Sequence, residues 1–163
     1  MQAQQLPSDI PNHYDESKRE KEQMTTKTDR ADLKTDQQRL EAQLGALYEA
    51  WRVRNAPNMR KLFSNDERLL LWGTDRWERI EGRAEAEREF DRWIETCPPW
   101  TSFEVTYRAM DVREGIAWVA EEVTGLWSRE IESGATHFRI TTGWEEQGEE
   151  WKIRHAHIDI PLD

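Results

Sequence analysis

From Asp36 onward, apolar residues first recur every three or four positions, which is the period of one helix face. The stripe stops at Asn55-Ala56-Pro57, so a helix is predicted to end there. A short helix over residues 58–63 follows, and a longer one begins at Gly82 and stops at Pro98-Pro99. The stripe of the first helix consists of Leu40, Leu44, Leu47, Tyr48 and Trp51.

After Pro99 the helical period gives way to alternation of apolar and polar residues, the pattern of half-buried strands. Turn residues at Glu114-Gly115, Ser133-Gly134 and Gln147-Gly148 divide this part of the chain. Helices set apart from an antiparallel sheet are typical of an α+β layer fold. The predicted strands are residues 101–112, 116–128, 135–146 and 150–160, with a short hairpin formed by residues 68–72 and 76–80.

The first 35 residues follow neither pattern. They are rich in Gln, Lys, Glu, Asp and Thr and lack regularly spaced large apolar residues. Such a segment buries too little surface to offset its ordering entropy. We therefore expect a disordered, solvated polar leader over residues 1–35, helical at most from about Asp29. A single folded domain over residues 36–163 fits the chain length.

Charge narrows the range of partners. The formal net charge is −10, and residues 1–35 contain seven acidic and six basic residues, so nearly all of it belongs to the predicted domain. An acidic domain repels phosphate backbones and anionic lipids, so neither nucleic acid nor membrane is expected as a partner. The N-terminus resembles no signal peptide, and no apolar run approaches a membrane span. We expect a cytoplasmic protein, and the single cysteine, Cys97, excludes an intramolecular disulfide and a cysteine-rich metal site.

Four stretches, in this order, resemble the nuclear-transport-factor-2-like superfamily, and within it the SnoaL-like and ketosteroid-isomerase-like group. The chain is also similar to the association domain of calcium/calmodulin-dependent kinases. The resemblance covers residues 36–163 and implies a cone-shaped α+β barrel, with three N-terminal helices packed in a curved, mostly antiparallel sheet. The matching stretches are ALYEAWRVRNAPNMRKLFS (46–64), LLLWGTDRWERIEGRAEAEREF (69–90), GIAWVAEEVT (115–124) and GEEWKIRHAHIDIP (148–161).

This superfamily contains isomerases, dehydratases, cyclases, ligand-binding proteins and oligomerisation domains, and a shared fold does not give a shared chemistry. The resemblance implies a domain that binds a small organic molecule in its barrel. Such a domain would catalyse isomerisation, dehydration or cyclisation by acid–base chemistry without a cofactor. The alternative is a non-catalytic module for homo-oligomerisation or ligand sensing. In both cases we expect a homodimer formed through the open face of the sheet.

The strand over residues 135–146 offers a basic group to the expected pocket. His137 and Arg139 share one face of this strand, and the resemblance to the kinase association domain implies that this face looks inward. A buried guanidinium needs an anionic partner. That partner is either Glu122 on the neighbouring strand or a carboxylate of the ligand. The expected ligand is therefore a carboxylate or an aromatic compound.

Asp75 and Tyr48 are candidates by position. Asp75 lies in the hairpin turn, near the region where ketosteroid isomerases carry an Asp general base, but Asp is also a common turn residue. Tyr48 faces inward and would donate its hydroxyl to a ligand oxygen, or it is a core residue with a satisfied hydroxyl. Trp72 and Trp118 are candidates for an aromatic pocket wall, although packing accounts for most of the nine tryptophans. Trp51, Trp93 and Trp118 fit the core, and Trp100, Trp127 and Trp144 fit an interface.

The closing segment WKIRHAHIDIP, residues 151–161, contains two histidines one residue apart. His155 and His157 share a strand face, but no third ligand accompanies them, so a metal site is not expected. Proton transfer would require that they face the pocket. Strict alternation puts Trp151 and Ile153 on the histidine face, and Ala156 and Ile158 on the other. The second face ends in small and apolar residues, as a core-facing side would, so the histidines are expected to face solvent or a dimer partner. If they face the pocket instead, His155 is a catalytic candidate, together with His137 and Asp75. Asp159 replaces the serine of the family's usual His-x-His-x-Ser-x-Pro motif.

Overall fold

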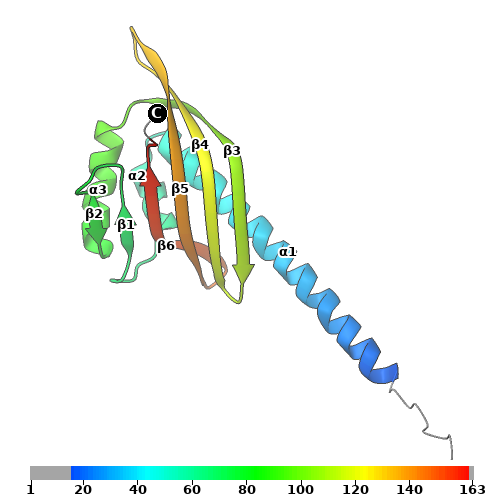
Figure 1. The fold of residues 1–163 in the computed structure, drawn as a ribbon. Coiled ribbons are helices and arrows are strands. Elements are labelled where there is room, and N and C mark those ends of the chain that lie inside the picture. The colour runs from blue at the N-terminus through cyan, green and yellow to red at the C-terminus, as the bar shows by residue number, and fades with distance from the viewer. Residues whose placement is uncertain (1–15, 162–163) are drawn as a thin grey trace, which may run out of the picture.

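The computed structural model describes residues 16–161, and side chains from residue 32 onward. Three helices pack against one face of a curved six-stranded sheet (Figure 1). The helices are α1 (Glu16–Arg52), α2 (Ala56–Leu62) and α3 (Arg83–Thr96). The strands are β1 (Leu70–Trp72), β2 (Arg79–Glu81), β3 (Trp100–Arg113), β4 (Ile116–Ser128), β5 (Ser133–Gln147) and β6 (Glu150–Asp159).

The predicted α+β architecture is confirmed. The strand order is β2-β1-β6-β5-β4-β3, and β1 runs parallel to β6 while all other neighbours are antiparallel. The sheet wraps around the C-terminal part of α1 and does not close, since β2 and β3 remain its edges. No helix in the described part of the chain is long and apolar enough to cross a membrane.

Helix α1 starts earlier than the apolar stripe. It begins at Glu16, whereas the sequence predicts helix from about Asp29 at the earliest, so most of the predicted leader is helical here. In Figure 1 this part of α1 projects away from the sheet. The first core residue on the helix is Leu40, so the domain boundary at residue 36 remains a prediction. Residues 1–15 lie outside the described residues.

The core has two parts. The larger one joins Leu40 and Leu44 of α1 to Phe90 of α3 and to Trp144 and Trp151 of the sheet. Trp144 is therefore a core residue and not an interface residue, because it lies on the helix-facing side of β5. The smaller part lies around the start of β3 and contains Tyr48, Trp100, Val123, Phe138 and Ile140.

The predicted inward face of β5 is wrong. Phe138, Ile140, Thr142 and Trp144 are buried, so His137 and Arg139 point to the opposite, outer face. On β4 it is Glu121 that is buried, while Glu122 is exposed. Alternation sets both results, because burying the large apolar residues of a strand exposes every residue between them.

A β-bulge resolves the orientation of β6. Gly143 pairs with His155 and Trp144 pairs with Ile153, so Arg154 is an extra residue without a partner position. Before the bulge Trp151 and Ile153 are buried, and after it Ala156 is buried. Strict alternation, which groups Trp151 and Ile153 with the histidines, therefore fails at this one residue. The side chain of Arg154 lies 3.1 Å from the Asp66 carboxylate.

Helix α1 contains one glycine whose replacement tests the helix itself. Gly45 is exposed, and a Cβ atom at this position would meet no atom within 4 Å. Because glycine in a helix interior costs about 0.5–1 kcal/mol relative to alanine, we expect Gly45→Ala to raise the free energy of unfolding by about that amount. Urea denaturation measures the change. An unchanged or lower value would contradict a helical residue 45.

Candidate functional site

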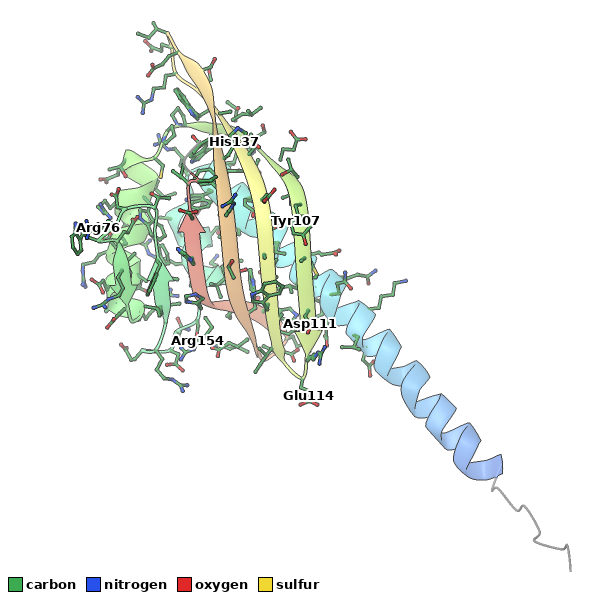
Figure 2. The ribbon with its side chains drawn as sticks, viewed as in Figure 1. Arg76, Tyr107, Asp111, Glu114, His137 and Arg154 are labelled. Carbon is green, nitrogen blue, oxygen red and sulfur yellow. The ribbon has the colours of Figure 1, made fainter. Side chains whose placement is uncertain are left out.

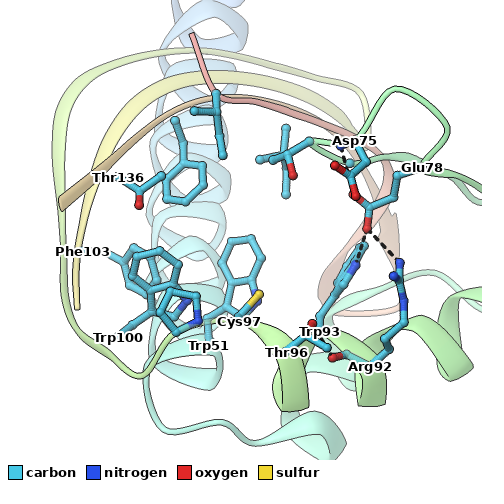
Figure 3. A pocket seen from close by; sticks show the side chains of 16 residues that line it. Trp51, Asp75, Glu78, Arg92, Trp93, Thr96, Cys97, Trp100, Phe103 and Thr136 are labelled. Carbon is cyan, nitrogen blue, oxygen red and sulfur yellow. Dashed lines mark hydrogen bonds and ion pairs between the residues drawn. The ribbon is translucent and has the colours of Figure 1, made fainter. Parts of the chain in front are cut away.

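A cavity of about 270 Å3 opens at the end of the sheet where β3 begins (Figure 3). Its walls come from α1, the β1–β2 turn, the C-terminal end of α3, and the nearby ends of β3, β5 and β6. Most of the wall is apolar, and the polar groups gather on the side of the turn and α3. The apolar residues of the wall include Trp51, Trp93, Trp100, Phe103, Phe138, Ile158 and Ile160, and the polar ones include Thr74, Asp75, Glu78, Arg92, Thr96 and Cys97.

Glu78 is the less exposed of the two carboxylates in this wall, with 11% of its side chain exposed. Its Oε1 accepts a hydrogen bond from the Trp93 indole N–H at 2.6 Å, and Arg92 Nη2 lies 3.3 Å from the same oxygen. Its Oε2 accepts only a long bond, 3.4 Å, from the backbone N–H of Asp75. Figure 3 shows these contacts as dashed lines on one side of the cavity. The carboxylate is thus fixed in place and retains an oxygen with capacity for a further donor.

The β1–β2 turn makes room for this carboxylate through Gly73. The turn is closed by backbone hydrogen bonds between Gly73 and Glu78, and between Glu78 and Asp75. A Cβ atom on residue 73 would lie 1.8 Å from Glu78 Oε2. Only glycine therefore lets the Glu78 side chain fold back over the turn toward Trp93.

Gly73→Ala is expected to push Glu78 off Trp93. We expect a loss of about 1–3 kcal/mol in the free energy of unfolding, since the indole N–H loses a charged acceptor. The Trp93 indole N–H resonance, assigned by comparison with Trp93→Phe, should move upfield as its hydrogen bond is lost. Gly45→Ala is the matched control, with no upfield shift expected. An unshifted resonance in Gly73→Ala would show that Glu78 does not depend on this glycine.

Cys97 lies on the same side of the cavity, immediately after α3. Burial raises the pKa of its thiol above the usual range. The thiol is therefore protonated near neutral pH and is a weak nucleophile. Its position fits a wall residue better than a reactive one.

Behind the cavity wall lies a polar cluster of three residues, in which Tyr48 and Glu121 are buried and the Arg108 side chain stays 28% exposed. The Tyr48 hydroxyl donates to Glu121 Oε2 at 2.7 Å, and Arg108 Nη2 lies 2.6 Å from Glu121 Oε1. Only 3% of Glu121 is exposed. A bulge in β3 turns Arg108 inward, because register shifts between Val105 and Tyr107. Tyr48 is thus a core residue with a satisfied hydroxyl and is not among the residues that line the cavity.

Stability should depend on the ionisation of Tyr48 at alkaline pH. Burial, followed by the charge of Glu121, raises the pKa of Tyr48 well above 10, its usual value. A raised folded-state pKa gives a contribution that is complete below the unfolded pKa and is lost as pH rises above it. Relative to Tyr48→Phe, the wild type should lose about 1.4 kcal/mol of unfolding free energy per pH unit above about pH 10. Urea denaturation of both proteins measures this, and parallel pH profiles would refute it.

Four of the predicted site residues lie on the outer face of the sheet. Glu122 and Arg139 are cross-strand partners there, and both are exposed. His137 Nδ1 lies 3.0 Å from the hydroxyl of Thr124, and Trp118 is 48% exposed. Figure 2 shows His137 on this face, together with Tyr107. These residues are grouped with one another but are separated from the cavity by the sheet, so Trp118 does not belong to the core.

The remaining predicted residues, His155, His157 and Trp72, make contacts between β6 and β1. His155 Nδ1–H donates to the Leu70 carbonyl at 3.0 Å, and the His157 ring meets Trp72 edge-on at 5.7 Å between centroids. These contacts join β6 to β1. Among residues 32–161, no group of three or more His, Cys, Asp or Glu is placed to hold a metal ion.

Of the predicted site residues, only Asp75 lines the cavity. Glu78 is the most important site residue that the sequence analysis did not identify, although the sequence pattern around it indicated an inward side chain. In the predicted strand over residues 76–80, Glu78 shares a face with the apolar Ile80, which is 3% exposed. Trp51 and Trp93 pack against the larger core, as expected, and also line the cavity. Trp100, expected at an interface, is buried and lines the cavity as well.

Comparisons with known proteins agree with this fold. The sequence profile described as the SnoaL-like domain matches residues 40–163, whereas no curated protein matches the chain. A nuclear-transport-factor-2-like protein of unknown function from Pseudomonas putida superposes with a TM-score of 0.68. The two chains are 16% identical, over 80% of this chain and 89% of that one.

Two further solved structures bear names that suggest functions. One, a proposed dehydratase of the nuclear-transport-factor-2-like family from Streptomyces avermitilis, has a TM-score of 0.62 and 15% identity, over 80% of this chain and 99% of that one. The other, a proposed calcium/calmodulin-dependent protein kinase II association domain from Xanthomonas campestris, has a TM-score of 0.60 and 18% identity, over 74% and 86%. At these identities the likeness shows the fold alone.

Proposed function

Because the chain belongs to the SnoaL-like domain family, we propose that it binds a small organic molecule in the cavity between Trp51, Trp100 and Glu78. One observation carries this proposal: a mostly apolar cavity that is lined by a largely buried carboxylate side chain. Ligand sites are typically concave and apolar with a few convergent polar groups. A volume of about 270 Å3 suits a molecule of one or two rings. The proposed compartment is the cytoplasm.

Acid–base chemistry without a cofactor is the reaction class that these residues support. A carboxylate that reaches a bound molecule can remove or return a proton, as isomerisation and dehydration require. Glu78 and Asp75 are the proposed groups, since both line the cavity. His137 and His155 lose their proposed catalytic roles, because they lie on the other side of the sheet. The neighbour named as a proposed dehydratase is consistent with this class.

A blocking variant tests the cavity directly. Thr136 lines the cavity, while Thr141 of the same strand faces outward. A panel of one- and two-ring aromatic compounds is screened by native mass spectrometry, and the compounds that bind are titrated by calorimetry. We expect Thr136→Trp to abolish binding and Thr141→Trp to preserve it. If every compound that binds also binds Thr136→Trp with unchanged affinity, the cavity is not the binding site.

A second proposal concerns assembly. The outer face exposes three large aromatic residues, with Trp72 46%, Tyr107 56% and Trp118 48% exposed. Aromatic residues enriched on one face favour an interface, so we propose a homodimer through this face. Trp118→Glu should then give a monomer in analytical ultracentrifugation. Ile131→Glu, at the tip of the β4–β5 hairpin and 97% exposed, should leave the dimer intact. A monomeric wild type would reject the proposal.

A further inference from the structure

We propose that the cavity selects organic cations, namely molecules with an aromatic body and an ammonium group. The inference rests on the proposed function, since it names the class of molecule that the cavity takes. It depends on three observations. Aromatic rings form much of the cavity wall, two carboxylates line the wall with only one guanidinium, and Arg139 lies on the outer face of the sheet and not in the cavity. The expected carboxylate ligand depended on Arg139 facing inward, and that orientation is wrong.

The rings form a continuous wall that suits a cation. Phe103 lies 5.3 Å from Trp100 and 6.0 Å from Trp51 between ring centroids. Trp100 also meets Phe138 edge-on at 5.6 Å. The faces of aromatic rings attract ammonium groups within about 6 Å, and this attraction grows when the cation is removed from water. A cation in this cavity would therefore be stabilised on the apolar side as well as on the polar one.

The charges on the polar side favour a cation as well. Two carboxylates, Asp75 and Glu78, line the cavity with a single guanidinium, that of Arg92. Arg92 is already bound to a further carboxylate outside the wall, Glu89, and this bond is the main cause of its raised pKa. The wall therefore carries an excess of negative charge, and the Glu78 carboxylate is well shielded from water. Charges interact more strongly in such a site than on the surface.

An anionic ligand finds no comparable partner. Arg139 lies on the outer face, and Arg92 is the only basic residue among those that line the cavity. A carboxylate placed there would face Glu78 across a partly desolvated space, and like charges in such a space repel. A neutral ligand such as an alcohol would have the rings and at most one hydrogen bond to Glu78, without the attraction between opposite charges.

Three ligands of one shape test this inference: 1-naphthylmethylammonium, 1-naphthalenemethanol and 1-naphthoate. Each is titrated into the full chain by calorimetry near neutral pH. We expect the ammonium to bind at least about 10-fold more tightly than the alcohol, and the carboxylate to bind most weakly. Glu78→Gln, which keeps the shape, should reduce the affinity for the ammonium to that for the alcohol. Glu130→Gln, which removes the same charge at the exposed hairpin tip, should change neither.

The outcomes separate this inference from the proposed function. If the alcohol or the carboxylate binds as tightly as the ammonium, and Thr136→Trp abolishes that binding, the cavity binds ligands but the preference for cations is overturned. If none of the three binds, the preference for cations is overturned, whereas the proposed function is decided by the wider compound screen with Thr136→Trp. Thermal unfolding shows whether Glu78→Gln is folded. If it is not, Asp75→Asn at the exposed rim replaces it, with an expected loss of about 3-fold for the ammonium alone. If a folded Glu78→Gln or Asp75→Asn variant binds the ammonium compound with unchanged affinity, that result counts against the inference.

Discussion

Replacing Arg108 by methionine is expected to lower the free energy of unfolding by about 3 kcal/mol. Arg108 supplies the cation that faces Glu121, whose side chain is 1% exposed. Without it, Glu121 would keep a single hydrogen bond from Tyr48 and would carry an uncompensated charge into the core. Removing the cation alone leaves a buried carboxylate without its partner, which is far more damaging than removing both members of the pair. Urea denaturation, followed by tryptophan fluorescence, measures the loss.

Two further variants define what this loss means. A triple variant that combines Arg108→Met with Glu121→Leu and Tyr48→Phe should recover most of the stability, because it leaves neither a buried charge nor an unpaired hydroxyl. Arg113→Met is the surface control, since the Arg113 side chain is 80% exposed, and its effect should stay within about 0.5 kcal/mol. If Arg108→Met behaved like Arg113→Met, Glu121 would not depend on its cation.

Gly125→Val is the second change with a large expected effect, because the new side chain would collide with two aromatic rings that line the cavity. A Cβ atom at residue 125 would lie 2.7 Å from Trp100 Cζ3 and 3.1 Å from Phe103 Cε1. These rings pack against each other and cannot both move without deforming the wall. We expect a loss of about 2–3 kcal/mol in unfolding free energy. The affinity for 1-naphthalenemethanol should fall about 10-fold, since the rings that bind it are displaced.

The control is Gly134, which also lies against a tryptophan ring but is not among the residues that line the cavity. A Cβ atom at Gly134 would lie 2.6 Å from Trp127 Cζ2, but Trp127 is only partly buried, near the hairpin tip, and does not line the cavity. Its ring can turn toward solvent, so Gly134→Val should cost less than about 1 kcal/mol and leave the affinity unchanged. Equal losses of affinity in the two variants would mean that the effect does not come from the wall.

The fold could be predicted from the sequence because its local signals agree. The strand boundaries follow the turn glycines Gly115 and Gly148, both at positive φ, and the first helix ends where its apolar stripe ends. The bulge at Arg154 and the one between Val105 and Tyr107 escaped prediction, because an extra residue in a strand leaves no compositional mark. Beyond each bulge, the side chains that would face outward face inward and the reverse. Each bulge therefore changes which residues of the rest of that strand are candidates for the site.

The candidate site was less predictable for a different reason. Its wall is assembled from the ends of elements that lie far apart in the chain, and only packing brings Trp51, Glu78 and Trp100 together. The orientation assigned to His137 and Arg139 came from a resemblance, whereas the buried Phe138 and Ile140 beside them carried the contrary signal. His137 and Arg139 suggested a function because they are polar, but the burial of the apolar residues beside them determines which face of β5 looks toward the cavity.

The position of β6 has a consequence for how the protein matures on the ribosome. This last strand lies between β1 and β5, so the hairpin of β1 and β2 has no sheet to join until β6 has been synthesised. Until then the β3–β5 meander presents the unpaired edge of β5, which could pair with another nascent chain. The sheet is therefore completed only after residues 150–159 have been synthesised, and we expect that slowing translation before residue 150 would favour aggregation over folding.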